Sequence, residues 1–293
     1  MHVMSTLRSI LAHPANRGHS LTAVARYLGW QVSKRLGARY WDIPFHGLTL
    51  RCHRDSHSAS AAMYFSGMPD FREMCFMQRY LRPGDTFLDV GANVGVYTMI
   101  AAALVGASGS VHAFEPGAAT AMRLRENIDL NALRHVSVHE LALSDRDGSA
   151  LLDNGCDDCV ASLVPQVGTT SDSHGMSVRC ARLDTLLPDT QAAMAKLDVE
   201  GAEPLVVRGA RSLMARGVPP VMQIEMDGYC RKFGIETHSF IAELSDQGYD
   251  TGYYDERANR IVYTQRTVNV LAVNRARRAE VDARLGAKIA QIR

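Results

Sequence analysis

The sequence lacks long apolar runs, and its charges nearly cancel. Its 293 residues contain no stretch of about 20 consecutive apolar residues, the length that a membrane-spanning helix needs. The first residues also lack the apolar core of a secretory signal, so we expect the chain to stay in the cytoplasm. A formal net charge of +1 predicts no bulk attraction to nucleic acid. Hydrophobic residues make up 46% of the chain, which is typical of a globular protein with a packed core.

The chain has six cysteines but no regular disulfide framework, and in a chain this long they are more typical of reduced thiols. Cys156 and Cys159 form the only Cys-x-x-Cys. A zinc site would need further ligands, such as Cys180 and His174, to converge on this pair. Because no second Cys-x-x-Cys exists, we expect an ordinary polar loop here, with zinc binding as the alternative.

Acidic residues are absent from residues 1–40, which contain six basic residues. Apolar residues recur there at helical spacing, which predicts an amphipathic helix over residues 20–36. We expect its apolar side to pack on the main domain and its basic side to face solvent. The alternative is a helix that rests on an anionic membrane surface or beside a lipid-linked substrate. The apolar positions are Leu21, Val24, Ala25, Leu28, Val32 and Leu36.

Residues 87–97 predict a buried strand, a tight glycine turn and the start of an apolar helix. The glycines at positions 91 and 95 let the backbone come close to a ligand. Glu115 follows Gly91 by 24 residues, at the end of the next apolar run. In a doubly wound α/β sheet this layout holds a nucleoside, and the carboxylate accepts the ribose hydroxyls.

The turn distinguishes between two nucleoside ligands. A dinucleotide fold needs Gly-x-Gly-x-x-Gly, but here Asn93 and Val96 occupy the second and third glycine positions. Asp89 stands two residues before the turn, where it would repel a pyrophosphate. S-adenosylmethionine has no phosphate and carries a cationic sulfonium and an amino group, so a nearby carboxylate suits it better. The turn therefore favours S-adenosylmethionine over NAD, and a nucleoside fold that has lost its ligand is a third interpretation.

Alternating strands and helices continue beyond this turn, and residues 149–182 interrupt them with an inserted β-hairpin or loop. A run of extended segments ends the pattern, which implies an antiparallel pair at the edge of the sheet. A seven-stranded methyltransferase sheet ends in this way. The predicted parallel strands are 86–90, 111–115, 136–143, 195–199 and 221–226, and the final extended segments lie near 250–254, 261–264 and 268–273.

We therefore expect an α/β protein of three parts. Residues 1–80 form a basic extension made of a helix, a β-hairpin and a further helix. Residues 81–274 form the nucleoside-binding domain, with the β or loop insertion at 149–182. Residues 275–293 form a basic tail that we expect to be a solvated helix.

Several blocks of the sequence together resemble the FkbM family of S-adenosylmethionine-dependent O-methyltransferases. The resemblance covers roughly residues 64–273, and its first and last blocks together are specific, whereas either alone would indicate only a class I methyltransferase. The blocks are residues 81–85, 87–95, 114–116 and 196–203, with further matches at Asn127, 142–145, Gly148 and 183–184.

This resemblance implies a seven-stranded, doubly wound class I methyltransferase sheet, similar to a Rossmann fold, that binds S-adenosylmethionine. The turn and Asp89 would hold the methionine end, Glu115 would accept both ribose hydroxyls, and Ala142 would lie near the adenine. Family members act on hydroxyls of sugars, polysaccharide precursors and polyketides, so the resemblance implies O-methylation of a carbohydrate, glycolipid or polyketide-type acceptor. The residues implied to bind the cofactor are Asp89, Gly91, Ala92, Asn93, Gly95, Glu115, Pro116 and Ala142.

Methyl transfer to a hydroxyl needs a positioned acceptor and a group that takes its proton. Asp198, Glu200 and Glu225 all belong at the carboxyl ends of predicted strands, where ligands gather in open α/β sheets. On a continuing strand Asp198 and Glu200 would face the same way, so either could act as the base or orient the acceptor. Capping of the following helix is the alternative role for Glu200 and Glu203.

A metal ion and a histidine base are further alternatives. Asp198, Glu225 and Asp227 could hold Mg²⁺ and bring the two oxygens of a vicinal diol onto it. His53 and His57 precede the cofactor domain, where a wall of the acceptor site would form. The other histidines considered as bases are His112, His139 and His238.

Two functions outside the methyltransferases also compete. An NAD(P)-dependent oxidoreductase is disfavoured by Asn93 and Val96, which replace two glycines of its turn. A non-catalytic nucleoside-binding scaffold is disfavoured because every expected cofactor position still carries a suitable polar group.

Overall fold

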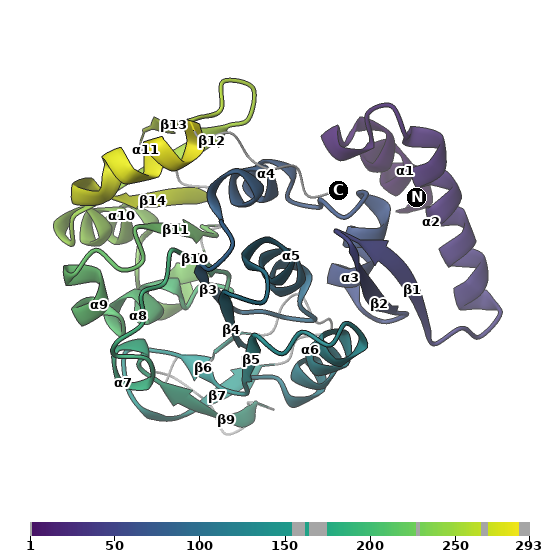
Figure 1. Ribbon diagram of the computed structural model, residues 1–293. Coiled ribbons are helices and arrows are strands. Elements are labelled where there is room, and N and C mark those ends of the chain that lie inside the picture. The colour runs from purple at the N-terminus through teal and green to yellow at the C-terminus, as the bar shows by residue number, and fades with distance from the viewer. Residues whose placement is uncertain (1, 154–161, 164–174, 227–228, 265–268, 287–293) are drawn as a thin grey trace.

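The computed structural model describes residues 2–153, 162–163, 175–226, 229–264 and 269–286. Eight strands form the main sheet, in the order β13-β12-β14-β11-β10-β3-β4-β5 (Figure 1). The strands from β11 to β5 run parallel, and β14, β12 and β13 add an antiparallel edge. The strands are β3 (Thr86–Val90), β4 (Ser110–Phe114), β5 (Val136–His139), β10 (Met194–Leu197), β11 (Val221–Ile224), β12 (Tyr249–Asp255), β13 (Arg260–Tyr263) and β14 (Val270–Asn274).

The α/β fold with an antiparallel edge that the sequence predicts is confirmed, although among the described residues the main sheet has eight strands rather than seven. The eighth strand is β13, which pairs with the outer edge of β12 through a short antiparallel hairpin. Its residues were predicted to be extended, but the number of strands in the antiparallel edge depends on pairing between segments, which periodicity does not specify.

Helices cover both faces of the sheet, so the strands are buried on two sides. In β3 alternate residues belong to the two cores: Phe87 packs in one and Leu88 in the other. The first face is covered by α4 (Phe71–Tyr80), α5 (Val96–Val105), α6 (Ala118–Leu130) and α11 (Arg278–Gly286). The second is covered by α7 (Leu183–Leu186), α8 (Glu203–Arg208), α9 (Arg211–Ala215) and α10 (Thr237–Asp246).

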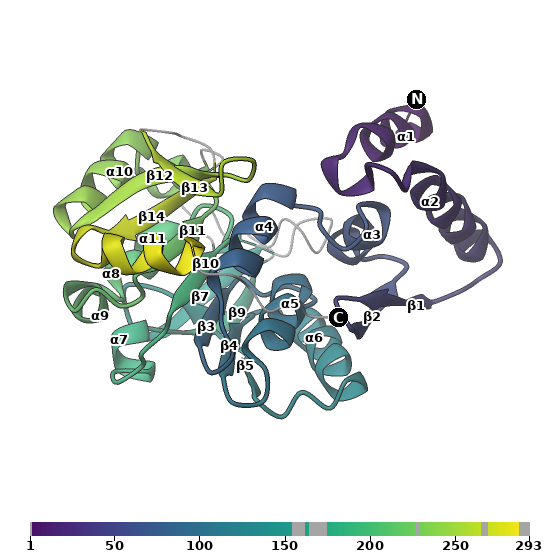
Figure 2. The same ribbon diagram turned by 45° about the horizontal axis from the view of Figure 1, so that its top comes forward.

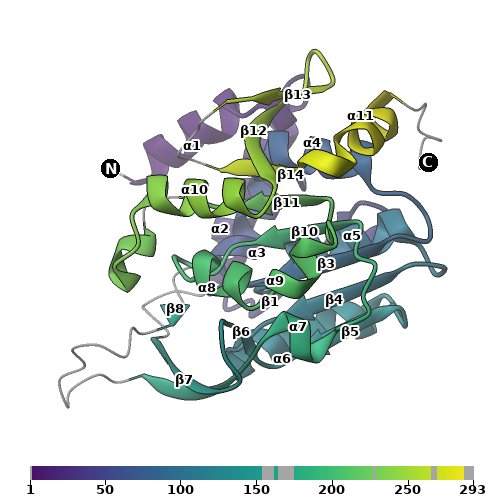
Figure 3. The ribbon, with the colours of Figure 1, turned by 90° about the vertical axis from the view of Figure 1, so that its left-hand side faces the viewer.

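A second, four-stranded sheet in the order β6-β9-β7-β8 lies beside the main sheet near α7 (Figure 3). The predicted insertion supplies β8, β9 and most of β7, whereas β6 comes from the end of the predicted strand 136–143, which the structure divides into β5 and β6 in different sheets. Its strands are β6 (Ala142–Leu143), β7 (Gly148–Asp153), β8 (Ser162–Leu163) and β9 (Met176–Ala181). Cys156, Cys159 and His174 lie outside the described residues. Cys180 is buried in β9 as a free thiol.

The N-terminal region carries a separate two-stranded sheet and three α-helices (Figure 2). Among the described residues, no helix combines the length and the apolar character that crossing a membrane requires. The elements are α1 (His2–Ala12), η1 (Pro14–Asn16), α2 (Ser20–Arg35), β1 (Tyr40–Phe45), β2 (Leu48–His53) and α3 (His57–Tyr64). Two further 3-10 helices lie elsewhere, at η2 (Tyr229–Phe233) and η3 (Arg275–Arg277).

The helix predicted over residues 20–36 is present as α2, but it packs through a different face from the one expected. Ala23, Tyr27 and Trp30 are its buried residues. These positions are also spaced i, i+4, i+7, so they form a competing stripe, and its two aromatic rings bury more area than the leucines would. The predicted apolar stripe is therefore in solvent: Leu21 is 86% exposed, Leu28 49%, Val32 52% and Leu36 83%.

The expectation of a solvated C-terminal helix is wrong for α11. Val281 and Leu285 are buried against the core beneath α4. The Arg284 guanidinium donates to the Asp85 carboxylate over 2.6 Å and lies over the Tyr80 ring. This helix is held to the domain by two apolar side chains and a cation, which a count of its basic residues does not reveal.

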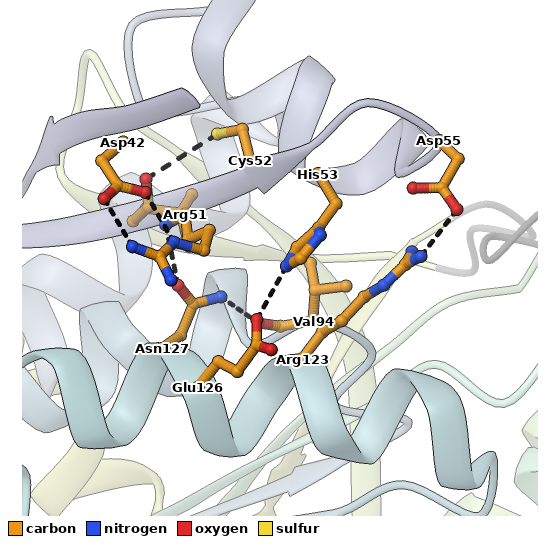
Figure 4. A network of polar contacts seen from close by, with 10 residues as sticks. Asp42, Arg51, Cys52, His53, Asp55, Val94, Arg123, Glu126 and Asn127 are labelled. Atoms are coloured by element: carbon orange, nitrogen blue, oxygen red, sulfur yellow. Dashed lines mark hydrogen bonds and ion pairs between the residues drawn. The ribbon is translucent and has the colours of Figure 1, made fainter. Parts of the chain in front are cut away.

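Two asparagines of α6 tie the N-terminal hairpin to the cofactor domain. The Asn127 side chain accepts a hydrogen bond from the Arg51 backbone N–H (2.7 Å) and donates to the Val94 carbonyl (2.9 Å) (Figure 4). Asn131, one turn later, accepts from the Thr49 N–H and donates to the Thr49 carbonyl. These amides satisfy the open edge of β2 as a neighbouring strand would. Around them, His53 contacts Glu126 and Asp55 accepts from Arg123 (Figure 4).

Candidate active site

A cavity of about 700 Å³ opens at the carboxyl ends of β3, β4, β10 and β11. This volume is within the range of small-molecule sites, and the place is where ligands bind in open α/β sheets. Residues of α2, α3 and the connection between β2 and α3 complete its wall on the N-terminal side. The cavity therefore joins the cofactor domain to the N-terminal region.

A row of three buried polar residues crosses the sheet at the base of this cavity. Asp89, Lys196 and Gln223 lie on the neighbouring strands β3, β10 and β11 and are paired in register, so their side chains share one face. All three line the cavity and none is more than 7% exposed. Asp89 Oδ1 and Gln223 Oε1 have no hydrogen-bond partner among the residues that the structure describes. Buried acceptors in this state are suited to a ligand that brings donors.

Asp89 is held rigidly in this row. Its Oδ2 accepts a 2.5 Å hydrogen bond from the Thr98 hydroxyl of α5. Burial raises the pKa of the carboxyl, and the positive charge of Lys196 opposes that shift. The remaining oxygen faces a cavity in which the ammonium group of a methionine would be both a donor and a countercharge. The residue thus fits the role that the family resemblance implies.

The glycine turn is shaped by close backbone packing. Gly91 has φ +82°, and a Cβ there would lie 1.8 Å from the carbonyl oxygen of Asp198. Gly95 has φ +97° and is the N-cap residue of α5, and a Cβ there would lie 2.5 Å from a methyl group of Leu124. Asn93 adopts φ 52°, a left-handed conformation that asparagine tolerates. Glycine is therefore required at both positions for packing and conformation.

All five backbone N–H groups of this turn donate within the protein. Gly91 and Ala92 donate to the Phe114 carbonyl, and Gly95 donates to the Ala92 carbonyl. Asn93 donates to Glu115, and the N–H of Val94 donates to the Asn93 side chain. The turn consequently presents no N–H cradle to a pyrophosphate, in contrast to a dinucleotide-binding turn.

Glu115 follows β4 and is 6% exposed. Its Oε2 accepts from the Asn93 N–H (2.9 Å) and its Oε1 accepts from the Gly117 N–H (2.8 Å). The two backbone donors fix the carboxylate on the cavity wall next to Pro116, where it can accept ribose hydroxyls. Farther along the wall, Ala142 lies among the apolar residues Leu141, Leu143, Leu152 and Leu163, which offer an apolar surface for a flat base.

Lys196 and Asp198 form an ion pair at the end of β10. Burial opposes the charge of the Lys196 ammonium, but Asp198 and Asp89 outweigh it and raise the pKa of the lysine. The ammonium also lies 4.4 Å from the centroid of the Tyr97 ring. Burial raises the pKa of Asp198, but Lys196 and a hydrogen bond with Glu225 outweigh burial and lower it. Asp198 is therefore an ionised carboxylate at neutral pH.

The three predicted catalytic carboxylates all line the cavity, but the reason given for Glu200 is wrong. β10 ends at Leu197, and Glu200 lies in a turn with φ 55°, so Asp198 and Glu200 do not alternate along one strand. Glu225 follows β11, and its backbone N–H donates to the Leu197 carbonyl. Its hydrogen bond with Asp198 needs one proton shared between the two carboxyl groups.

Glu203 supports the turn that carries Asp198. Its Oε1 accepts from the backbone N–H groups of Val199 (2.9 Å) and Gly201 (3.2 Å). Burial raises the pKa of this carboxyl to about 7, although the hydrogen bonds from the turn oppose the shift. This contact is the capping role considered for Glu203 from the sequence.

Of the candidate histidine bases, only His57 lines the cavity. His53 contacts Glu126 on α6 over 2.8 Å. His112 and His139 stack on each other between β4 and β5, where burial lowers both pKa values. His238 is exposed on α10, on the other face of the sheet.

The magnesium hypothesis finds no support. Asp227 lies outside the described residues, and within the described part of the chain no three His, Cys, Asp or Glu side chains converge as metal ligands. The Lys196 ammonium instead provides the countercharge for Asp198.

The sequence analysis missed the residues that complete the cavity. Lys196 and Gln223 interrupt otherwise apolar buried strands, and that interruption was the available signal. Tyr97 donates to Asp70 (2.9 Å) and accepts from Gln223 (3.1 Å), which connects the row to α4. The residues from the N-terminal region could not be assigned without the fold, and they include Tyr27, Gln31, Lys34, Arg54 and Tyr64.

Comparison with known proteins relates this chain to methyltransferases. Residues 89–251, more than half of the chain, match the family model of the methyltransferase FkbM domain. The 31-O-demethyl-FK506 methyltransferase FkbM of Streptomyces tacrolimicus is 40% identical over 83 residues, which are 27% of this chain and 30% of that relative.

Solved structures with a similar chain path include the methyltransferase FkbM of Methylobacillus flagellatus, with a TM-score of 0.41 and 15% identity. That match covers 73% of this chain and 52% of the other. An S-adenosylmethionine-dependent O-methyltransferase of Thermotoga maritima has a TM-score of 0.39 and 12% identity, with coverage of 70% and 65%. The chain thus spans about a third of the curated relative and half of the first structure.

Proposed function

This protein belongs to the FkbM methyltransferase family, and we propose that it is an S-adenosylmethionine-dependent O-methyltransferase. The acceptor we propose is a hydroxyl of a carbohydrate, glycolipid or polyketide-type molecule. One observation carries the proposal: a single cavity is lined by Asp89, the glycine turn and Glu115 and also by the ionised carboxylate of Asp198. The cofactor residues and a proton acceptor therefore share one space.

The protein's task in this reaction is to position an oxygen nucleophile and to receive its proton. Bound S-adenosylmethionine would supply a methyl group activated by its sulfonium. Asp198 would accept a hydrogen bond from the acceptor hydroxyl and so orient the oxygen for in-line attack. The proton becomes strongly acidic as the oxygen forms its new bond, so a carboxylate with a lowered pKa can still take it. Lys196 holds Asp198 in place and keeps it ionised.

The same turn argues against an NAD(P)-dependent oxidoreductase. The five backbone N–H groups of residues 91–95 already donate within the protein, and two carboxylates, Asp89 and Glu115, line the cavity beside them. A pyrophosphate would meet negative charge without its usual backbone donors. This arrangement favours a phosphate-free nucleoside ligand.

Calorimetric titration with S-adenosylhomocysteine, beside NADH, tests the cofactor. We expect saturable binding of S-adenosylhomocysteine only, weakened about 10- to 100-fold by Glu115→Ala because charged hydrogen bonds are lost. Glu140→Ala is the matched control, since Glu140 is exposed on the protein surface and pairs with Arg125. Binding of NADH alone would contradict the proposal and support an NAD(P)-dependent oxidoreductase. Binding of neither compound would also contradict the proposal.

A hydroxyl panel then tests the acceptor. Purified protein is incubated with S-adenosylmethionine and sugars, sugar phosphates, glycolipids or polyketide alcohols, and release of S-adenosylhomocysteine is measured. Turnover with a hydroxyl compound that is absent with its deoxy analogue supports O-methylation. Turnover that requires an amine or a carboxylate instead would show that the methyl group goes to another atom.

A further inference from the structure

The cavity changes character on its N-terminal side. There α2 contributes Tyr27, Gln31 and Lys34, the residue after β2 is Arg54, and α3 contributes Tyr64. Lining residues between positions 27 and 64 include two cations and no carboxylate. This differs from the opposite side, where Asp89, Glu115, Asp198, Glu200 and Glu225 line the same cavity.

Lys34 and Arg54 lie close enough for the charge of one to affect the other. Lys34 is partly buried, and its ammonium lies 5.0 Å from the centroid of the Trp30 ring. Burial first, and then the positive charge of Arg54, lower the pKa of Lys34, while the negative charge of Asp55 opposes the shift without reversing it. Two like charges that face one cavity repel each other, and an anion between them would relieve that repulsion.

Neither cation has a carboxylate partner at ion-pair distance among the residues described. Asp55, the neighbour of Arg54, accepts instead from Arg123 on α6 over 2.6 Å. The neutral groups nearby are hydrogen-bonding side chains: Gln31 donates to the Tyr64 hydroxyl over 3.0 Å. Donors and positive charge are therefore gathered at one end of the cavity.

We propose that Lys34 and Arg54 bind a phosphate group of the acceptor, so that the substrate is a phosphorylated hydroxyl compound such as a sugar phosphate or sugar diphosphate. A phosphate carries about −1.5 to −2 charges at neutral pH and balances both cations, whereas a single carboxylate balances one. The acceptor would span the cavity from this phosphate subsite to Asp198. The identity of the acceptor rests on the proposed methyl transfer, but phosphate binding at Lys34 and Arg54 does not.

The first test is calorimetric titration of the full chain with inorganic pyrophosphate, in buffer free of phosphate and with S-adenosylhomocysteine present. We expect saturable binding that weakens about 10-fold or more in Lys34→Gln and in Arg54→Gln. Lys34→Arg should retain binding because it keeps the charge. Arg125→Gln, which changes the net charge equally but on the outer surface of α6, should bind as the natural chain does.

The outcomes separate this proposal from the methyltransferase proposal, because S-adenosylhomocysteine binding is measured on the same samples. Absence of pyrophosphate binding, or equal weakening in Arg125→Gln, would overturn the phosphate subsite. Pyrophosphate binding without S-adenosylhomocysteine binding would support the subsite and contradict the proposed function.

A second arm identifies the source of the phosphate. UDP-glucose represents soluble sugar nucleotides, and a polyprenyl phosphate in micelles represents lipid-linked acceptors. Binding of either one that depends on Lys34 and Arg54 supports the subsite and names its source. If both fail to bind while pyrophosphate binds, the subsite does not serve an acceptor and the proposal falls.

The outer face of α2 carries an independent inference. Leu21, Ala25, Leu28, Val32 and Leu36 follow one another at helical spacing, and all five are exposed. Figures 1 and 2 show α2 at the outer edge of the molecule, on the side away from α10. This helix therefore lines the cavity with one face and presents an apolar stripe to solvent with another.

The charge around the stripe indicates what covers it. Arg8, Arg17, Arg35 and Arg39 are exposed, and residues 1–40 contain no acidic residue. A second copy of the chain would bring two positive surfaces together, which electrostatic repulsion opposes. An exposed apolar stripe in a basic segment that has no acidic residue is typical of a helix at an anionic membrane surface. The geometry points to docking of α2 on an anionic lipid bilayer.

Vesicle co-sedimentation of the full chain tests this docking. We expect the protein to pellet with vesicles of phosphatidylcholine and phosphatidylglycerol, and to pellet less with phosphatidylcholine alone or at high salt. Leu28→Gln with Val32→Gln should reduce pelleting several-fold, whereas Met122→Gln with Leu130→Gln, a matched pair of exposed residues on α6, should not.

Absence of pelleting, or equal loss in both double variants, would overturn membrane docking. Sedimentation velocity of the same proteins without vesicles gives the remaining outcome. A dimer that Leu28→Gln with Val32→Gln dissociates would assign the stripe to a second copy of the chain and would also overturn the bilayer.

Discussion

The two halves of the cavity are built in different ways. The cofactor half is made from one strand–turn–helix–strand unit: the turn at 91–95, Asp89 just before it, and Glu115 directly after the next strand. The acceptor half is assembled from residues far apart in the chain, such as Lys34, Arg54 and Glu225. Local hydrogen bonds hold the first half, whereas packing of the N-terminal region on the domain holds the second.

This difference indicates which half of the cavity tolerates amino-acid substitutions. All backbone N–H groups of the turn donate to partners within the protein. Its two glycines lie so close to Asp198 and Leu124 that neither position has room for a side chain. Few substitutions there preserve the shape of the site. The cations on α2 and after β2 can change without breaking the fold of the sheet, so acceptor preference can vary over a constant cofactor site.

We expect the largest effect on stability and ligand binding from a substitution in the cofactor half. In Gly91→Ala the new Cβ would lie 1.8 Å from the carbonyl oxygen of Asp198, so the backbone of the two strand ends must separate. We expect a loss of more than about 4 kcal/mol of unfolding free energy, measured in urea, and no S-adenosylhomocysteine binding.

Gly84→Ala is the matched control for that substitution. Gly84 has φ +90°, close to that of Gly91, but a Cβ there would meet only Ser108 Oγ at 3.9 Å. It should lose about 1–2 kcal/mol from the left-handed backbone alone and keep its ligand. Equal losses in the two variants would show that the close approach to Asp198 does not matter.

The next effect tests the carboxylate between the two halves. Asp198→Asn removes the proton acceptor but keeps the shape of the side chain, so we expect turnover to fall about 10²- to 10⁴-fold while S-adenosylhomocysteine still binds. Turnover is measured with an acceptor that the natural chain methylates. Glu225→Gln is the control, because an amide can still donate to Asp198, and its loss should be smaller.

If Asp198→Asn keeps its turnover, the carboxylate is not the proton acceptor, and His57 becomes the remaining candidate from the original set that lines the cavity. If it loses S-adenosylhomocysteine binding as well, its role is to hold the cofactor half together.

The difference between the two halves also explains which parts of the site the sequence predicts. The turn and Glu115 could be assigned because glycine conformation and the strand–turn–helix order are local properties. The row of Asp89, Lys196 and Gln223 could not be assembled, because it depends on the register of three strands that are distant in sequence. A lysine inside an apolar strand was the visible sign.

The errors in the N-terminal and C-terminal helices have one cause. Helical periodicity finds a stripe but does not say which stripe packs when two are present. In α2 the stripe with Tyr27 and Trp30 is buried and the stripe with Leu28 is not. In α11 two apolar residues, Val281 and Leu285, were enough to dock a helix whose composition looked solvated. The turn at Glu200 adds a third case, since the strand ends at Leu197 before the expected alternation continues.

The contact between the two halves gives a smaller effect. Asn127→Ala removes the bonds to both Arg51 in the hairpin and Val94 in the glycine turn, so we expect a loss of about 2–4 kcal/mol in unfolding free energy and weaker S-adenosylhomocysteine binding. Asn131→Ala removes the bonds to Thr49 of the hairpin and one to the Asn127 carbonyl within α6, but none to the glycine turn, and should leave S-adenosylhomocysteine binding unchanged. If both variants bind S-adenosylhomocysteine as tightly as the natural chain does, the hairpin does not influence the cofactor half.

The smallest expected effect is a pH dependence of the unfolding free energy that arises from Glu203, which supports the turn carrying Asp198. Burial raises the pKa of Glu203 to about 7 in the folded protein, above the ordinary value of about 4.3 in an unfolded chain. The folded state therefore binds more protons between these values, and this group's contribution to stability falls as the pH rises through that window. Between pH 6 and pH 8 the unfolding free energy should fall by roughly 1 kcal/mol on its account.

Glu203→Gln should abolish that slope, because the amide keeps an oxygen that accepts from Val199 and Gly201 but does not titrate. The measurement is the difference between urea unfolding free energies of the natural chain and the variant across this range. Other titrating groups, such as His13 and His46, whose pKa values burial lowers, contribute equally to both proteins and cancel in the difference. Parallel curves would show that Glu203 is ionised in the folded protein. In that case the turn that carries Asp198 is held by a charged Glu203 carboxylate. The hydrogen bonds from Val199 and Gly201 to that carboxylate would then outweigh the free-energy cost of burying its charge.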